Sequence, residues 1–211
     1  MKRATLFSEG VLVLCLGHLN VEAGIIPVQN PSFEDPPTAT FTSGGIPGWD
    51  LVSGSVGSVG VWNINSDPLG WWTVTAPDGN QVAYLGRPGG SASIKQDVPT
   101  TVVSGITYVL TGFVGHPSGL SPTYLVGILS GGNLVASEQS TGPQGTFSTF
   151  TVTWTGDALN VGQQLGIRLY SDNYQTAFDN IQFTAVPEPS TYLASIASIG
   201  LIGMFLVRRR D

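Results

Sequence analysis

Cysteine and positive charge are nearly absent from this 211-residue sequence. The single cysteine, Cys15, lies in an apolar run near the amino terminus that we expect to be removed. Without thiols, the rest of the chain can form neither a disulfide framework nor a thiolate metal site. The fold is therefore expected to be stabilised by its hydrophobic core or by an ion with oxygen ligands.

Basic residues are also few in this sequence. Between residues 24 and 186 three bases stand against ten acids, which gives this segment a net charge of about −7. Nucleic-acid affinity comes largely from Lys and Arg side chains that neutralise phosphates. The charge balance therefore excludes DNA and RNA as partners.

Catalytic signatures are also missing. His116 is the only histidine between residues 24 and 186, and we expect it to be solvated in a loop. The sequence has no Gly-x-Ser-x-Gly elbow and no His-Glu-x-x-His motif. Ten acids allow many carboxylate pairs of the kind that glycoside hydrolases use, but nothing singles one out. We therefore expect a protein that is not an enzyme, with a glycan hydrolase as the less favoured alternative.

The amino terminus has the pattern of a secretory signal peptide. It begins Met1-Lys2-Arg3, continues with an apolar run over residues 10–19 and ends with Val21-Glu22-Ala23. The apolar run is too short to cross a hydrocarbon core about 30 Å thick. Signal peptidase is expected to remove residues 1–23, which leaves 24–186 as the folded domain.

The sequence of this domain predicts an all-β fold. Apolar and polar residues alternate with period two in several windows, and no window shows the 3.6-residue apolar period of a helix. In residues 147–155, Phe150, Val152 and Trp154 share one face and threonines occupy the other. A tight hairpin is expected at Gly131-Gly132-Asn133. The pattern predicts an antiparallel two-sheet β-sandwich, a jelly roll. The expected strands are 81–85, 92–98, 107–115, 123–130, 134–138, 147–155, 164–170 and 177–185.

The carboxyl-terminal segment, 187–211, differs from the domain in composition. An apolar stretch over 192–207 reaches about 24 Å as a helix, so it is expected to insert only marginally into a membrane. Arginines after it hold that end on the cytoplasmic side. An ordinary membrane anchor is the alternative to a processed tail. The residues that define the segment are Pro187, Glu188, Pro189, Arg208, Arg209 and Arg210.

This tail resembles the PEP-CTERM sorting signal of Gram-negative bacteria, on the residues Val186 to Ser190, the apolar stretch and the arginine cluster. The resemblance implies recognition by an exosortase and cleavage near Pro187-Glu188-Pro189. It further implies passage through the inner membrane to the cell surface or extracellular matrix. Members of this group commonly accompany exopolysaccharide and biofilm loci.

Asp179 is expected to lie on the core face of the last strand, because alternation groups it with Ala177, Ile181 and Phe183. A carboxylate there needs a proton, a hydrogen bond or a cation, and oxygen ligands suit Ca²⁺. The segments 30–34, 47–49 and 178–181 resemble galactose-binding-like jelly rolls of carbohydrate-binding modules. The resemblance implies a structural calcium at Glu34 and Asp179. A solvated Glu34 and a turn-forming Asp179 are the alternative.

Aromatic side chains in loop-like segments are candidates for sugar binding, because pyranose rings stack on indoles and phenols. Trp49 and Trp154 are assigned to the core instead. We therefore predict contact with matrix polysaccharide, and the alternative is a purely structural surface protein without a small ligand. The candidate sugar-binding residues are Trp62, Trp71, Trp72 and Tyr124.

Overall fold

The structure is a computed structural model that describes residues 24–187. The expected signal peptide and most of the tail, including Glu188, Pro189 and Arg208–Arg210, lie outside the described residues. The described chain is all-β, which confirms the predicted fold class. Its strands are β1 (Gly24–Ile26), β2 (Phe41–Ser43), β3 (Asp50–Ser53), β4 (Val59–Asn63), β5 (Gln81–Leu85), β6 (Ala92–Thr101), β7 (Ile106–Gly115), β8 (Thr123–Ser130), β9 (Asn133–Thr141), β10 (Phe147–Thr155), β11 (Gln164–Ser171) and β12 (Thr176–Pro187).

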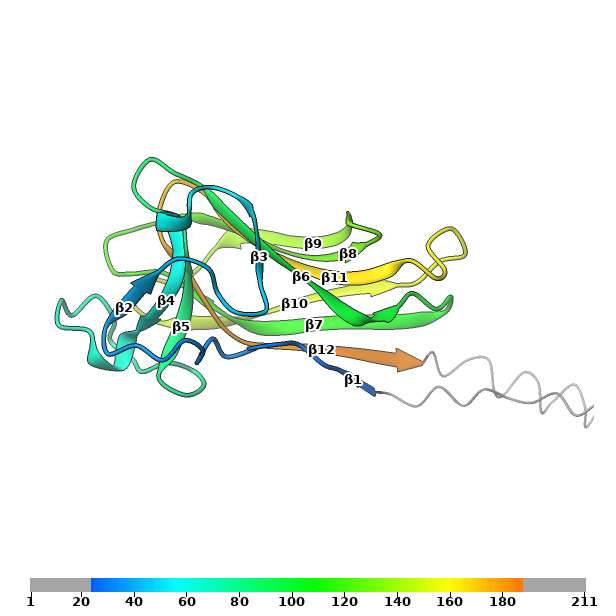
Figure 1. The fold of residues 1–211 in the computed structure, drawn as a ribbon, viewed down its shortest axis with the longest axis horizontal. Helices are drawn as coiled ribbons and strands as arrows, with labels where there is room; N and C mark the ends of the chain where they lie inside the picture. The colour runs from blue at the N-terminus through cyan, green and yellow to red at the C-terminus, as the bar shows by residue number, and fades with distance from the viewer. Residues whose placement is uncertain (1–23, 188–211) are drawn as a thin grey trace, which may run out of the picture.

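Two antiparallel sheets face each other in a jelly-roll-like sandwich (Figure 1). The seven-stranded sheet has the order β10-β7-β12-β5-β4-β2, with β1 paired to β12. The five-stranded sheet has the order β3-β6-β11-β8-β9. Two short 3₁₀ turns, η1 (Val56–Ser58) and η2 (Ile64–Ser66), flank β4. No helix in residues 24–187 has the length and apolar character that crossing a membrane requires.

The long strands follow the predicted alternation. All eight predicted strands are present, and 81–85, 123–130 and 147–155 have the predicted bounds. Gly131 and Gly132 join β8 to β9 with φ angles of 56° and 81°, as a tight hairpin requires. Strands β1 to β4 were not predicted, because three are only three or four residues long and β4 is buried on both faces.

The main core lies between the sheets. Its side chains come from alternate positions of the long strands, for example Leu165, Ile167 and Leu169 of β11. The predicted core assignment of Trp49 is confirmed, since this side chain is 6% exposed, and Trp154 packs against the core while half-buried. Inward burial of these side chains provides the main driving force for folding.

A second apolar cluster covers the opposite face of the seven-stranded sheet. In β5, Ala83 and Leu85 point into the main core, while Val82 and Tyr84 belong to the second cluster. Successive strand residues point to opposite faces, so the second cluster lies outside the sandwich. The segment after β4 folds over it. The cluster consists of Trp62, Ile64, Trp72, Ala76, Val82, Tyr84 and Ala177, with Phe147 packed against them.

A bulge in β12 corrects the predicted face of Asp179. Strand β12 pairs with β7 through Asp179↔Phe113 and Gln182↔Thr111, so two residues of β12 lie opposite Gly112. Asn180 occupies the bulge with a φ of 47°. Phe178 joins the main core and Ala177 the outer cluster, so the predicted single face for 177, 179, 181 and 183 is wrong.

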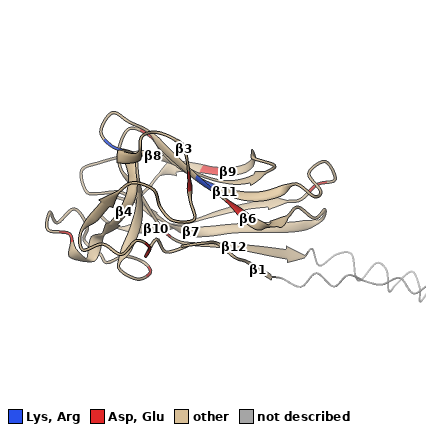
Figure 2. Ribbon diagram, viewed as in Figure 1, with Lys and Arg blue, Asp and Glu red and all other residues tan. Residues whose placement is uncertain are grey.

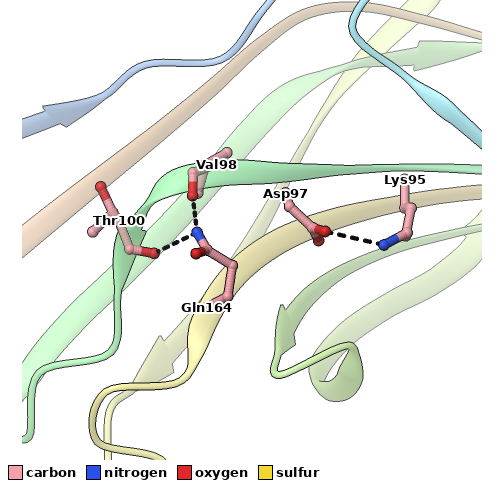
Figure 3. A network of polar contacts seen from close by, with 5 residues as sticks. All are labelled: Lys95, Asp97, Val98, Thr100 and Gln164. Atoms are coloured by element: carbon pink, nitrogen blue, oxygen red, sulfur yellow. Dashed lines mark hydrogen bonds and ion pairs between the residues drawn. The ribbon is translucent and has the colours of Figure 1, made fainter.

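A second irregularity joins β6 to β11. The register shifts between Gln164↔Thr101 and Gly166↔Asp97. The Gln164 side-chain amide donates to the carbonyl oxygens of Val98 and Thr100 and so satisfies backbone groups at the shift (Figure 3). Figure 3 also shows the ion pair between Lys95 Nζ and Asp97, 3.1 Å apart.

The two ends of the sandwich are distinct. Gly24 pairs with Ala185, so β1 and the end of β12 lie side by side at one end (Figure 1). At the other end Ala177 pairs with Tyr84 of β5. Strand geometry places Ala177 and Pro187 roughly 30 Å apart. The chain therefore leaves the domain at the end opposite to the outer aromatic cluster.

Candidate active site

A cavity of about 620 Å³ lies at the β2–β4–β5 end of the molecule, a size typical of small-molecule sites. Its wall is mostly apolar. The polar lining groups are few, and Asp67 is the only charged one. Charged residues are sparse along the described part of the ribbon (Figure 2). The residues that form most of the wall are Phe41, Trp62, Pro68, Leu69, Trp71, Tyr84, Pro88 and Leu120.

Tryptophan rings form one side of the cavity. The Trp62 ring from β4 meets the Trp71 ring edge-on, with centroids 5.9 Å apart and an interplanar angle of 84°. Trp62 is 7% exposed, whereas Trp71 is 40% exposed at the rim. Trp72 supports them from outside the cavity lining: it meets Trp62 edge-on and stacks on Phe147 at 4.7 Å and 6°. This packing fixes the ring faces that a bound molecule would contact.

Asp67 organises the loop that carries these rings. Its Oδ2 accepts hydrogen bonds from the backbone N–H groups of Trp71 at 2.7 Å and Trp72 at 3.3 Å. Its Oδ1 accepts from the N–H of Leu69 at 3.0 Å. The Oδ1 of Asn65 accepts from the N–H of Ala76 at 2.8 Å and closes the loop. The loop is therefore held by side-chain oxygens, and its one carboxylate faces the cavity.

Tyr84 also lines this cavity. It lies on β5 against Gly60 of β4, where a Cβ would come within 2.9 Å of the Tyr84 ring. Burial raises the pKa of Tyr84, and a hydrogen bond from Ser43 opposes this effect. The phenol therefore keeps its proton throughout the neutral range and beyond. Tyr84 was not among the predicted site residues, because residues 81–85 carry only the signal of a buried strand.

The four predicted sugar-binding aromatics are separated by the fold. Trp62 and Trp71 line the cavity, and Trp72 is buried beneath it. Tyr124 is buried inside the sandwich, edge-on to Phe178, and its hydroxyl donates to Glu138 Oε1 at 2.5 Å. Tyr124 was expected to be accessible beside a loop-like segment. This expectation is wrong, because Tyr124 lies near the start of β8, where strand alternation turns it inward.

His116 also differs from expectation. It is 1% exposed, and its Nδ1–H donates to the Pro117 carbonyl at 3.2 Å. Within residues 24–187, His116 Nε2 and Trp72 Nε1 are buried without a hydrogen-bond partner. The expectation of a solvated His116 is wrong, because the chain after β7 packs under the loop of residues 143–145.

The predicted calcium residues are brought together at a separate place. Asp179 is fully buried, and its carboxylate accepts from the N–H groups of Asp78 at 2.8 Å and Asn180 at 2.7 Å. Glu34 Oε1 accepts from the N–H groups of Asn80 and Gln81. Burial raises the pKa of Asp179 to about 8; the two N–H groups oppose this, and the charges of Asp78 and Glu34 add to it. Among residues 24–187, no cluster of three or more acidic, His or Cys side chains is arranged to bind a metal.

The described residues form a jelly-roll-like sandwich with a largely apolar cavity at one end. Comparison with known families identifies its group. The model of the HpiC1-like family, described as HpiC1 cyclase, matches residues 25–184, so the chain belongs to the HpiC1-like family. The PEP-CTERM protein-sorting motif matches residues 185–210, which confirms the predicted sorting signal and shows an exported protein with a membrane-anchored intermediate.

Solved structures agree with the family. A Stig cyclase, Fisc from Fischerella sp. TAU in complex with (3Z)-3-(1-methyl-2-pyrrolidinylidene)-3H-indole, is 27% identical with a TM-score of 0.69, over 79% of this chain and 99% of that one. A Fischerella cyclase in its apo form is 25% identical with a TM-score of 0.70, and the match covers 80% of this chain and 99% of that one. No curated protein matches the chain.

Carbohydrate-binding modules share the fold. TmCBM61, solved in complex with β-1,4-galactotriose, is 17% identical with a TM-score of 0.51, over 77% of this chain and 99% of that one. At this identity the likeness concerns the fold alone.

The expectation that the protein is not an enzyme is wrong. The family model describes a cyclase, and the Fischerella proteins similar to this chain are cyclases. The expectation relied on missing nucleophile and metal motifs. A ring-closing enzyme needs none of these if a shaped cavity and a few polar groups suffice.

Asp179 generates a prediction for stability. An unfolded Asp releases its proton near pH 4, whereas folded Asp179 holds its proton to about pH 8. Between these values the folded state binds more protons, so the free energy of unfolding contributed by Asp179 falls as the pH rises. Asp179→Asn is expected to remove this fall in urea unfolding without divalent cations. Asp50→Asn, on an exposed strand position, is the control. Parallel pH profiles for wild type and Asp179→Asn would contradict the assignment.

Proposed function

We propose that the chain is an exported cyclase that binds a small, largely apolar and unsaturated molecule in the 620 Å³ cavity and promotes ring closure. Membership of the HpiC1-like family supports the reaction class. The observation that carries the proposal is the cavity itself, which Trp62, Trp71, Tyr84 and Asp67 line together. The indole ligands of two similar Fischerella cyclases favour an indole-bearing substrate.

Each lining group has a role in this proposal. The Tyr84 O–H donates a hydrogen bond to the part of the substrate on which negative charge develops. The carbon framework then gains positive charge, which the faces of Trp62 and Trp71 and the carboxylate of Asp67 stabilise. Apolar walls exclude water from the reacting centre. Ring closure forms one new σ bond from the electrons of a π bond of the unsaturated substrate. Substrate and product therefore have the same formula, and the step needs no co-reactant.

The position of the cavity fits an exported enzyme. The cavity is lined by residues of β2, β4 and β5. These strands lie at the end of the molecule opposite to the end of β12 at Pro187 (Figure 1). We place the cavity facing away from the membrane while the tail is inserted. Processing by an exosortase would then release or attach the protein at the cell surface of a Gram-negative bacterium without altering the site.

A turnover assay tests the proposed cyclase activity. Indole derivatives with unsaturated side chains are incubated with the protein, and products of unchanged mass are sought by liquid chromatography and mass spectrometry. Tyr84→Phe is expected to lower kcat by about 10²-fold, the usual loss for one donor, with KM little changed. Trp62→Ala is expected to raise KM. Tyr170→Phe, on the five-stranded sheet, is the control. A Tyr84→Phe variant with the full rate would overturn the role of Tyr84, and no conversion of any compound would count against the cyclase.

Carbohydrate binding is a second candidate function, favoured by the exposed Trp71 ring at the cavity rim. A flat indole face at a rim suits a pyranose ring. Polysaccharide would then be a partner of the exported protein.

Affinity electrophoresis in gels that contain neutral polysaccharides tests this candidate. If the cavity rim binds the polysaccharide, Trp71→Ala is expected to abolish retardation. Tyr174→Ala is a matched control, because Tyr174 is 41% exposed and does not line the cavity. Unretarded wild type, or equal retardation of Trp71→Ala, rejects sugar binding at the rim.

We also propose that Ca²⁺ binds at Glu34 and Asp179. The support is a buried carboxylate beside two further acids, with oxygen as the only ligand type. Backbone carbonyl oxygens would have to complete the coordination shell, because the described side chains alone do not form a metal cluster.

Thermal unfolding tests the calcium site. Chelation is expected to lower the Tm by the mass-action term, and millimolar Ca²⁺ to restore it. Asp179→Asn should lose this response, whereas Asp50→Asn should keep it. A wild-type Tm that is indifferent to chelator refutes the proposal.

A further inference from the structure

A second, smaller cleft lies on the outer face of the seven-stranded sheet, over β10, β7 and β12, which are neighbours in that sheet (Figure 1). Its volume is about 290 Å³. It shares no lining residue with the aromatic cavity. Whatever it binds is therefore held independently of the cyclase site.

The bulge of β12 creates this cleft. Two residues of β12 lie opposite Gly112, between the pairs Asp179↔Phe113 and Gln182↔Thr111. The regular hydrogen-bond ladder between β12 and β7 is therefore interrupted there. Asn180 adopts a left-handed backbone with φ 47°, a conformation that Asn tolerates better than most residues. Bulges of this kind re-aim side chains, and left-handed residues cluster at functional sites. Here the bulge turns the amide of Asn180 toward the cleft.

The lining is polar but carries no charge. Thr111, Thr149 and Thr151 contribute hydroxyl groups, and Asn180 and Gln182 contribute amides. The two amides are oriented by a hydrogen bond of 3.0 Å from Gln182 Nε2 to Asn180 Oδ1. Within the described residues, Asn180 Nδ2 and Gln182 Oε1 have no hydrogen-bond partner. The cleft thus presents one free donor group and one free acceptor from prearranged side chains.

The chemistry of this lining selects its ligand class. An anion would find no cation, and an apolar molecule would leave the amides unpaired. A neutral saccharide offers hydroxyl groups that both donate and accept, and Phe113 supplies an aromatic surface beside them. We infer that this cleft is a binding subsite for a neutral sugar unit. It would tether the enzyme to uncharged polysaccharide outside the cell while the cavity stays free.

Titration calorimetry of the full chain in detergent, with galactose, glucose, xylose and soluble galactan as probes, tests the inference. Gln182→Ala and Thr151→Val are each expected to weaken binding about tenfold, the usual effect of one lost hydrogen bond. Thr153→Val is the matched control, because Thr153 lies on the same exposed row of β10 outside the cleft. All three positions are on strand surfaces, so a preserved Tm is expected.

Each outcome is decisive. The proposed sugar site in the cleft is supported if Gln182→Ala and Thr151→Val weaken sugar binding. Thr153→Val and Trp71→Ala must leave that binding unchanged. Binding lost only in Trp71→Ala assigns the sugar to the cavity rim and overturns the inference. No binding of any probe at millimolar concentration overturns it as well, and leaves the cyclase proposal untouched.

Discussion

Burial of strand β5 on both faces is the constraint on which the rest of the molecule depends. Ala83 and Leu85 close the main core, while Val82 and Tyr84 need a second cover on the outside of the sheet. The loop after β4 provides that cover, held by N–H groups that donate to Asp67. A sandwich of this class is usually solvated on its outer face. Here the covered outer face contains the cavity, so the fold and the site are products of the same packing.

The sequence predicted most of the fold but only part of the site. Strand β10 was predictable to the residue, because one face is buried and the other is solvated, which produces a strict alternation. Strand β4 has no such alternation, since it is buried on both faces. The face of Asp179 was predicted wrongly because the bulge at Asn180 inserts one extra residue and so shifts the alternation by one, and a single sequence carries no reliable mark of a bulge.

Site residues were predictable where the residue type alone is informative. Tryptophans near loop-like segments were the candidates, and the buried Trp62 and the exposed Trp71 do line the cavity. Tyr84 was missed because its role follows from tertiary cover over β5, which local patterns do not show. The non-catalytic expectation failed for a related reason: the proposed catalytic groups, Tyr84 and Asp67, come from separate segments and leave no motif in the chain.

The proposed reaction site lies at the end of the domain opposite to Pro187. The central claim is that the space between Trp62, Trp71 and Tyr84 binds the substrate. A crystal structure with 4-(1H-indol-3-yl)butan-2-one, the compound bound in one of the similar Fischerella cyclases, tests this most directly. The account predicts the indole ring against Trp62 and the Tyr84 hydroxyl within hydrogen-bonding distance of the ketone. An empty cavity at saturating compound, or the compound bound elsewhere, would contradict it.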